Sequence, residues 1–244
     1  MNFHPAFMDV TRFDNEISLA EAASDHILQA IQQKPDLLLC AATGNTPTLS
    51  YQKLVEKASV FPLDQLRLFK LDEWGGVPME HSGTCETYLQ QYLISPLRIS
   101  TDRYFSFQSN PADPEQECVK VQKMLEQQGP IDLCILGLGL NGHLAFNEPG
   151  EYLQPHCHVA QLTEASLGHS MAQDMEGVKL YGLTLGMSDI LAAKEIMLLI
   201  SGASKVEITK RLLEGKISTQ LPASFLWLHP KVKVYVVTNF SNDE

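Results

Sequence analysis

Basic residues are scarce in this sequence. Eighteen lysines and arginines stand against 29 aspartates and glutamates, which gives a formal net charge of −11. A nucleic-acid-binding surface needs a basic face, so this balance argues against a nucleic-acid partner. It also argues against long-range attraction of an anionic ligand. Any bound anion must therefore be held locally, by backbone N–H groups and one or two cations.

Cysteines are few, and their number is odd. The sequence has five, with irregular spacing: Cys40, Cys85, Cys118, Cys134 and Cys157. Two of them lie inside apolar runs, where a free thiol behaves as a small hydrophobic side chain. We therefore expect all five to be reduced and the protein to be cytoplasmic.

Long apolar segments are absent too. No run approaches the roughly 20 residues that a membrane-spanning helix needs. Residues 1–12 do not have a basic region followed by an apolar run, as a signal peptide would. We expect neither a signal peptide nor an association with membranes.

Short apolar runs alternate with segments of helical periodicity along the whole chain. With 44% hydrophobic residues, 244 residues suffice for a sizeable core. Strands are expected at 36–42, 66–71, 131–136, 195–200 and 231–238, and helices after residue 18 and at 47–58, 84–93, 115–128 and 204–213. This alternation predicts an α/β, Rossmann-like fold, with a mainly parallel sheet and helices on both faces. We expect one domain over residues 1–244.

Three helix starts carry capping signals. Ser18 with Glu21, and Ser204 with Glu207, have the spacing of a capping box. Thr46 precedes Pro47, as an N-cap precedes a proline at the first helical position.

Ligands of such folds gather at the carboxyl ends of the parallel strands. Four loops of polar or glycine-rich sequence begin there, near Thr43, Asp72, Gly137 and Ser201. We expect a functional site where these loops meet.

The loop after the strand at 131–136 is the most informative. Three glycines, at 137, 139 and 142, precede His143, and Glu148 follows five residues later. Glycine permits close backbone approach and positive φ, and histidine is the side chain that exchanges protons most easily near neutral pH. The pattern indicates an acid–base site. The alternative is a tight turn with a buried histidine.

The loop Thr43, Gly44, Asn45, Thr46 leads from a strand into a helix. A helix N-terminus exposes N–H groups that hold phosphate well. Lys205, near the start of another helix, is disfavoured there unless an anion lies close by. The alternatives are an ordinary strand–turn–helix with a capping threonine and a solvated lysine.

Asp72 and Glu73 follow a strand. Alternation points them to opposite sides, so we do not expect a catalytic dyad, although one of them can face the cleft as a base. The alternative is that both are solvated or cap the next segment.

Two further segments, 156–158 and 225–229, are expected to have structural roles. His156, Cys157 and His158 lack a second cluster with ligand spacing, so we expect no metal. Residues 225–229 are apolar and are expected to form core or a subunit contact, with lining of the cleft as the alternative.

Four motifs occur in one order, at Thr43 to Pro47, Leu71 to Trp74, Asn141 to His143 and Phe146 to Pro149. In this combination the chain resembles the glucosamine-6-phosphate deaminase family over nearly its whole length. The galactosamine-6-phosphate isomerase branch is the one that the chain resembles most closely, on Asn141 and on residues 83–86 and 222–229.

The resemblance implies that a 2-amino-2-deoxy-hexose 6-phosphate opens its ring, moves a proton from C2 to C1, and loses ammonia to give a ketose phosphate. It implies that His143 assists ring opening, that Asp72 carries the proton and that Glu148 supports His143. Thr43, Gly44, Asn45, Thr46 and Lys205 would hold the phosphate. No cofactor is implied, and a homo-oligomer is possible because the family includes monomers and hexamers.

Two departures from the glucosamine enzymes stand out. They usually carry Asp where this chain has Asn141, whose amide can accept the imidazole N–H but brings no charge. They commonly present an Arg to the phosphate, yet residues 167–174 contain no Arg or Lys.

Two rival functions stay open. One is a 6-phosphogluconolactonase-type hydrolase, whose family lacks the Phe146 to Pro149 continuation. The other is a catalytically silent sugar-phosphate sensor.

Overall fold

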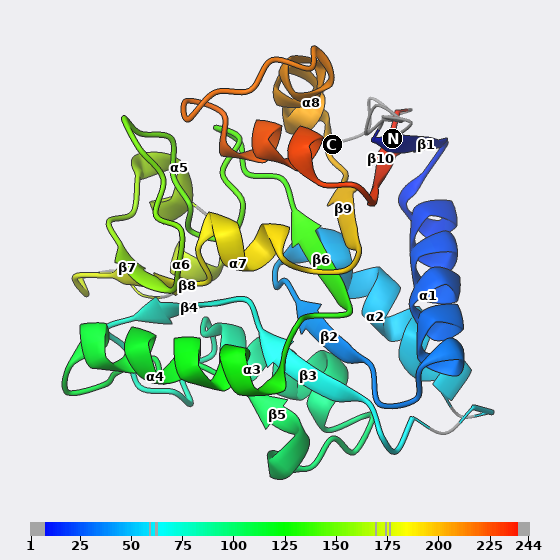
Figure 1. The fold of residues 1–244 in the computed structure, drawn as a ribbon, viewed down its shortest axis with the longest axis horizontal. Coiled ribbons are helices and arrows are strands. Elements are labelled where there is room, and N and C mark those ends of the chain that lie inside the picture. Colours follow the sequence, from blue (N-terminus) through cyan, green and yellow to red (C-terminus); the bar gives the residue numbers. More distant parts are fainter. Residues whose placement is uncertain are drawn as a thin grey trace, which may run out of the picture.

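The computed structural model describes residues 8–58, 60, 61, 63–168, 170–173, 175 and 177–238. Its centre is a seven-stranded sheet in which all neighbouring strands run parallel (Figure 1). The strand order is β1 (Asp9–Phe13), β10 (Val232–Val237), β9 (Ile196–Ile200), β6 (Leu133–Gly137), β2 (Leu38–Ala41), β3 (Arg67–Lys70) and β5 (Tyr104–Phe105). The expected parallel sheet is therefore confirmed.

Helices cover both faces of this sheet. Alternate residues of each central strand point to opposite faces, which is why the strands are continuous apolar runs. One face packs against α1 (Glu16–Gln33), α2 (Asn45–Ala58), α3 (Cys85–Leu89) and the π-helical turn Gln90–Ile94. The other packs against α4 (Pro114–Gln128), α7 (Met187–Leu191) and α8 (Val206–Leu213). The Rossmann-like α/β architecture follows from this double coverage.

A second, antiparallel sheet lies beside the main one. It has the order β4 (Asp72–Gly75), β8 (Tyr181–Thr184) and β7 (His158–Ala160), with Asp72 paired to Thr184. Its own small core contains Trp74 and Phe146, whose rings meet edge to face at 4.7 Å. Short helices α5 (Glu164–Leu167) and α6 (Ser170–Gln173) lie between β7 and β8 in the chain. This sheet was not predicted.

The chain reverses its direction across the main sheet between β2 and β6. After β2 it proceeds to β3 and β5 on one side, whereas β6, β9 and β10 follow on the other. Loops leaving such a switch point separate and leave a crevice. The strands β9, β6, β2 and β3 are neighbours in the sheet, so the four predicted loops emerge side by side at its carboxyl-terminal end.

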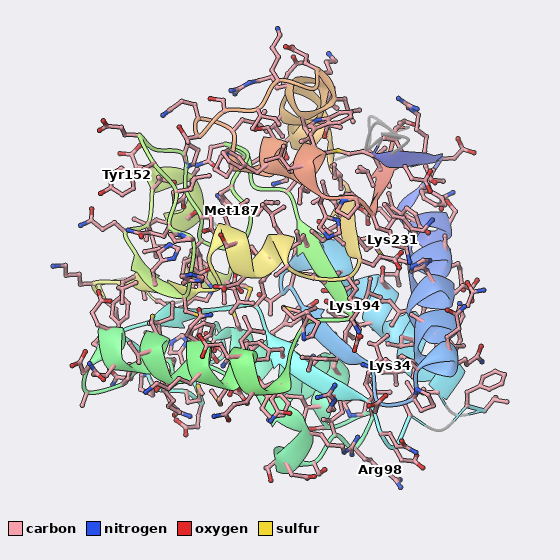
Figure 2. All side chains as sticks on the ribbon, in the orientation of Figure 1. Lys34, Arg98, Tyr152, Met187, Lys194 and Lys231 are labelled. Carbon is pink, nitrogen blue, oxygen red and sulfur yellow. The ribbon has the colours of Figure 1, made fainter. Side chains whose placement is uncertain are left out.

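At the opposite end of the sheet, where β2 and β6 begin, ion pairs connect neighbouring segments. Asp132, before β6, accepts from the amines of Lys34 at 2.5 Å and Lys194 at 2.8 Å and from the backbone N–H of Leu38 at 2.8 Å. Figure 2 labels both lysines at this end of β2 and β6. These charges tie strand ends together, away from the four loops.

The three capping predictions are wrong. Helix α1 is capped by Asn15, whose side chain accepts from the Ser18 N–H at 2.9 Å, so Ser18 is inside the helix. Helix α2 begins at Asn45, which places Thr46 in its first turn. Ser204 lies in a 3₁₀ turn, Ala203–Lys205, and α8 begins after it. Capping spacings recur within one turn of the true start, and the extended backbone at Asn15 selects the cap.

All five cysteines are free thiols, as expected. No helix among the described residues is long and apolar enough to cross a membrane.

Candidate functional site

The loop after β6 turns tightly around His143. A side chain at Gly139 would begin 2.4 Å from the His143 ring, and Gly142 has a φ of +89°. The Gly139 N–H donates to the His143 carbonyl at 3.0 Å. Both glycines are thus required, one by contact with the imidazole and the other by its backbone conformation.

Glu148 is held against His143 by several donors. Its Oε2 lies 3.4 Å from His143 Nδ1 and accepts from Asn141 Nδ2 at 2.8 Å and from Thr163 Oγ1 at 3.2 Å. Ser166 donates its hydroxyl to Oε1. Burial disfavours the charged carboxylate, but His143, Ser166 and Asn141 outweigh it and lower the pKa of Glu148 to about 2. Glu148 is therefore an anion over the whole physiological range.

Asn141 meets the backbone of His143 rather than its ring. The Asn141 Oδ1 accepts from the His143 N–H at 3.1 Å. The imidazole Nδ1 instead faces Glu148 and, at 3.4 Å, Ser166 Oγ. The expectation that the Asn141 amide accepts the imidazole N–H is wrong. Its oxygen accepts from the His143 backbone N–H, and its nitrogen donates to Glu148.

Asp72 is the first residue of β4 and is separated from the end of β3 by one residue, Leu71. Its side chain is buried, with 9% of the residue exposed. Burial and the neighbouring charge of Glu73 raise the pKa of Asp72 to about 7, against the opposing effects of Cys85 and Lys70. A carboxylate tuned in this way accepts and returns a proton near neutral pH.

The contacts of Glu73 indicate a structural role. It is fully buried and accepts from Lys70 Nζ at 2.7 Å and from the N–H groups of Trp74, Cys85 and Glu86 at 2.8 to 2.9 Å. It thereby holds the start of α3. For Glu73 the alternative interpretation, a cap on the next segment, is the one that the structure supports.

Lys70, which donates to Glu73, is also fully buried. It pairs with Glu73 and, at 2.9 Å, with Glu86, which also accepts from Tyr104 at 2.7 Å. Burial disfavours the ammonium, but the two glutamates outweigh it and raise the pKa of Lys70. Sequence patterns gave no signal for this network, whose members lie up to 34 positions apart.

The loop between β2 and α2 has the form of an anion-binding turn. Gly44 has a φ of +98°, and α2 begins directly after it. Thr46 Oγ1 lies 3.5 Å from Ser201 Oγ, which donates to it. Thr43, however, donates its hydroxyl to Cys85 Sγ at 3.2 Å.

Lys205 reaches from its 3₁₀ turn to the His143 loop. Its Nζ donates to the Leu138 carbonyl at 2.6 Å, and burial lowers the pKa of this amine. An ammonium has three N–H donors, so two are left for another acceptor.

Contacts join all four loops at the carboxyl-terminal end of the sheet. Thr46 meets the loop after β9, Lys205 joins that loop to the one after β6, and Thr43 connects through Cys85 to Asp72. The described chain has no hydrogen bond between Asp72 and His143. They are linked indirectly, because the Phe146 N–H donates to Thr184, the strand partner of Asp72, at 3.3 Å.

The remaining segments make structural contacts. His156 Nδ1 lies 3.1 Å from Asp189, and within the described ranges no group of three or more His, Cys, Asp or Glu is arranged to hold a metal. The segment at 225–229 lies partly in the core: Leu226 and His229 are buried, whereas Leu228 is 60% exposed. Trp227 donates to the Leu212 carbonyl, and His229 Nε2 contacts the Ala193 carbonyl. Of the Arg-free stretch 167–174, residues 169 and 174 lie outside the described residues.

Sequence reasoning missed Thr163, Ser166 and Cys85 as site residues. A hydroxyl or thiol in isolation carries no distinctive spacing. Only the fold brings these side chains to Glu148 and Asp72.

Comparison with known proteins assigns this architecture to a family. The sequence profile described as glucosamine-6-phosphate isomerases/6-phosphogluconolactonase matches residues 14–236. A protein named "Putative deaminase AgaI", from Escherichia coli (strain K12), is 45% identical, covering 93% of this chain and 90% of its own.

Two solved structures are similar. A monomeric glucosamine-6-phosphate deaminase has a TM-score of 0.90 at 32% identity, covering 94% of this chain and 97% of its own. A 6-phosphogluconolactonase from Thermotoga maritima has a TM-score of 0.76 at 19% identity, covering 95% and 100%, a likeness of fold alone. The resemblance inferred from the four motifs is therefore confirmed, and the chain belongs to the glucosamine-6-phosphate isomerase/6-phosphogluconolactonase family.

Proposed function

We propose that this protein is an amino-sugar phosphate isomerase that releases ammonia, and that its substrate is galactosamine 6-phosphate in preference to glucosamine 6-phosphate. The observation that carries the reaction type is Asp72, a buried carboxylate with a pKa of about 7 at the end of the sheet where the His143 loop also emerges. The sugar preference rests on the motifs at 83–86 and 222–229.

In this proposal His143 moves the proton between the ring oxygen and O1 as the sugar opens. Glu148, anionic and 3.4 Å from Nδ1, orients the imidazole and stabilises its charged form. The open chain then has a C1 carbonyl, which makes the C2 hydrogen acidic.

Asp72 removes the C2 proton, the enolate oxygen O1 takes a proton from the 2-ammonium group of the substrate, and Asp72 then returns its proton to C1. The resulting C2 iminium takes up water, and ammonia leaves to give the ketose 6-phosphate. General base catalysis of this kind is worth about 10²- to 10⁴-fold. Its geometry depends on the distant phosphate, which fixes C2 against the base.

The phosphate is proposed to lie at the start of α2. The backbone N–H groups after Gly44, with Asn45 and Thr46, supply donors, and Lys205 supplies the cation. Thr43 contributes its main chain, because its hydroxyl is given to Cys85.

We expect Lys205→Met to raise KM by about 10- to 100-fold, with a smaller change in kcat. A charged hydrogen bond to phosphate contributes about 1.5–3 kcal/mol. Steady-state kinetics of ammonia release measure this. Lys210→Met is the matched control, because Lys210 lies on the exposed side of α8 and pairs with Glu207 at 2.6 Å. Equal KM values in the two variants would remove Lys205 from the phosphate site.

The experiment that tests the function compares three substrates side by side. Ammonia is measured with galactosamine 6-phosphate and with glucosamine 6-phosphate, and acid release with 6-phosphogluconolactone. The proposal requires ammonia, and more of it from the galactosamine ester. Lactone hydrolysis without ammonia release would establish the hydrolase, and binding of sugar phosphate without turnover would establish the sensor.

A further inference from the structure

Cys85 stands between the proposed base and the loop at the end of β2. Its Sγ lies 3.8 Å from Asp72 Oδ1 and 3.2 Å from Thr43 Oγ1. The residue is only 1% exposed, at the first position of α3. Its backbone N–H donates to Glu73 Oε1 at 2.8 Å, which fixes where the sulfur is placed.

The direction of these hydrogen bonds follows from protonation. Burial and the charges of Glu73 and Asp72 raise the pKa of the Cys85 thiol well above its usual range. The sulfur therefore carries its proton at neutral pH and donates it to the acceptor, Asp72. Its lone pairs then accept the proton of the Thr43 hydroxyl.

Asp72 and Glu73 differ in the hydrogen-bond donors that their carboxylates receive. Glu73 receives four donors, from Lys70 and three backbone N–H groups. In the part of the chain that the structure describes, the Asp72 carboxylate receives the Cys85 thiol. A base that must gain and lose a proton needs a weak donor of this kind, since a strong one would lower its pKa and its basicity.

We propose that Cys85 is a positioning residue for Asp72: its thiol orients the carboxylate and connects it, through Thr43, to the loop proposed to hold the phosphate. The inference rests on the proposed function, in which Asp72 carries the C2 proton. The thiol contacts Oδ1, and among the described residues no hydrogen bond reaches Oδ2, which is the oxygen proposed to face the sugar. The thiol takes no part in bond making, because its proton stays on sulfur throughout.

The experiment detects the Asp72–Cys85 hydrogen bond by spectroscopy, without relying on turnover. The carboxyl carbon of Asp72 is titrated by ¹³C NMR in the wild type, Cys85→Ala and Cys85→Ser, and is assigned by its absence in Asp72→Asn. Cys118→Ala is the control, since Cys118 is as buried, at 2% exposure, but lies on α4. In the wild-type protein, infrared spectroscopy follows the S–H stretch of Cys85, assigned by its loss in Cys85→Ser.

Removing the donor should raise the pH at which Asp72 titrates by about half a unit in Cys85→Ala, which corresponds to about threefold in the proton affinity. Cys85→Ser, whose hydroxyl is a stronger donor than the thiol, should bring the midpoint back to the wild-type value or below it, and Cys118→Ala should not change it. The S–H band should move to lower frequency as Asp72 ionises. In the same samples kcat should fall about tenfold in Cys85→Ala, with KM unchanged and the acid limb of kcat/KM displaced to higher pH.

The inference is overturned if Asp72 titrates at the same pH in Cys85→Ala and wild type, or if the S–H band does not respond to Asp72 ionisation. The infrared result decides the matter if Cys85→Ala does not fold. If both spectroscopic shifts appear while the wild type releases no ammonia from either amino sugar, the Cys85–Asp72 contact stands and the proposed function fails.

Discussion

Asp72→Asn is expected to lower kcat by about 10²- to 10⁴-fold while KM stays within about threefold of the wild type. The amide keeps the size and the hydrogen-bonding reach of the carboxylate, but it cannot take the C2 proton. Steady-state ammonia release measures the change. A variant with wild-type kcat would show that Asp72 is not the base.

The same substitution should stabilise the fold. Asp72 has a pKa of about 7 in the folded protein and about 4 when unfolded. The folded state therefore binds the proton more tightly, and stability falls as the pH rises from the unfolded to the folded pKa. We expect Asp72→Asn to be more stable than the wild type by about 1–3 kcal/mol at pH 8, with the difference vanishing near pH 4. Urea unfolding at both pH values provides the control for misfolding, and a less stable variant at pH 8 would contradict the buried, ionisable base.

Lys70→Met should lower the free energy of unfolding by about 3–5 kcal/mol, the largest expected effect on stability. The substitution removes the cation from the fully buried carboxylate of Glu73 and from that of Glu86, whose side chain is 13% exposed. An uncompensated buried charge has a cost of this size. It should also move the acid limb of kcat/KM to higher pH, because the Lys70 charge holds the pKa of Asp72 down.

The matched control for this prediction is Lys216→Met, which removes an exposed ion pair with Glu214 at 2.8 Å. Such a pair contributes at most about 1 kcal/mol. A second control, Lys70→Met with Glu73→Gln, should recover part of the loss by removing one of the unpaired charges. Equal unfolding midpoints for the two single lysine variants would show that the Lys70 cluster does not support the fold.

Five strands of the main sheet could be predicted, because β10, β9, β6, β2 and β3 are largely buried on both faces and therefore read as continuous apolar runs. The edge strands β1, which is largely exposed, and β5, which has two residues, were not predicted. The second sheet could not be predicted either. A single residue, Leu71, separates β3 from β4, and β7 has only three residues, too few to show a period. The pairing of Asp72 with Thr184 spans more than 100 positions and has no local signal.

The meeting of the four loops was predictable from the fold class, but individual side-chain contacts were predictable only between residues that are close in the chain. Asn141, His143 and Glu148 lie within eight positions, and one turn brings them together. The donors that complete the cluster, Thr163 and Ser166, come from the segment around α5. Cys85 reaches Asp72 because Glu73 anchors the start of α3, which depends on burial rather than on pattern.

A crystal structure with an open-chain 2-amino-2-deoxy-hexitol 6-phosphate, which lacks the C1 carbonyl and cannot react, tests the proposed site most directly. We expect the phosphate at the start of α2 with Lys205, C2 within about 3.5 Å of an Asp72 oxygen, and O5, the former ring oxygen, beside His143. A ligand whose phosphate lies elsewhere, or whose C2 is out of reach of Asp72, would contradict the proposed site.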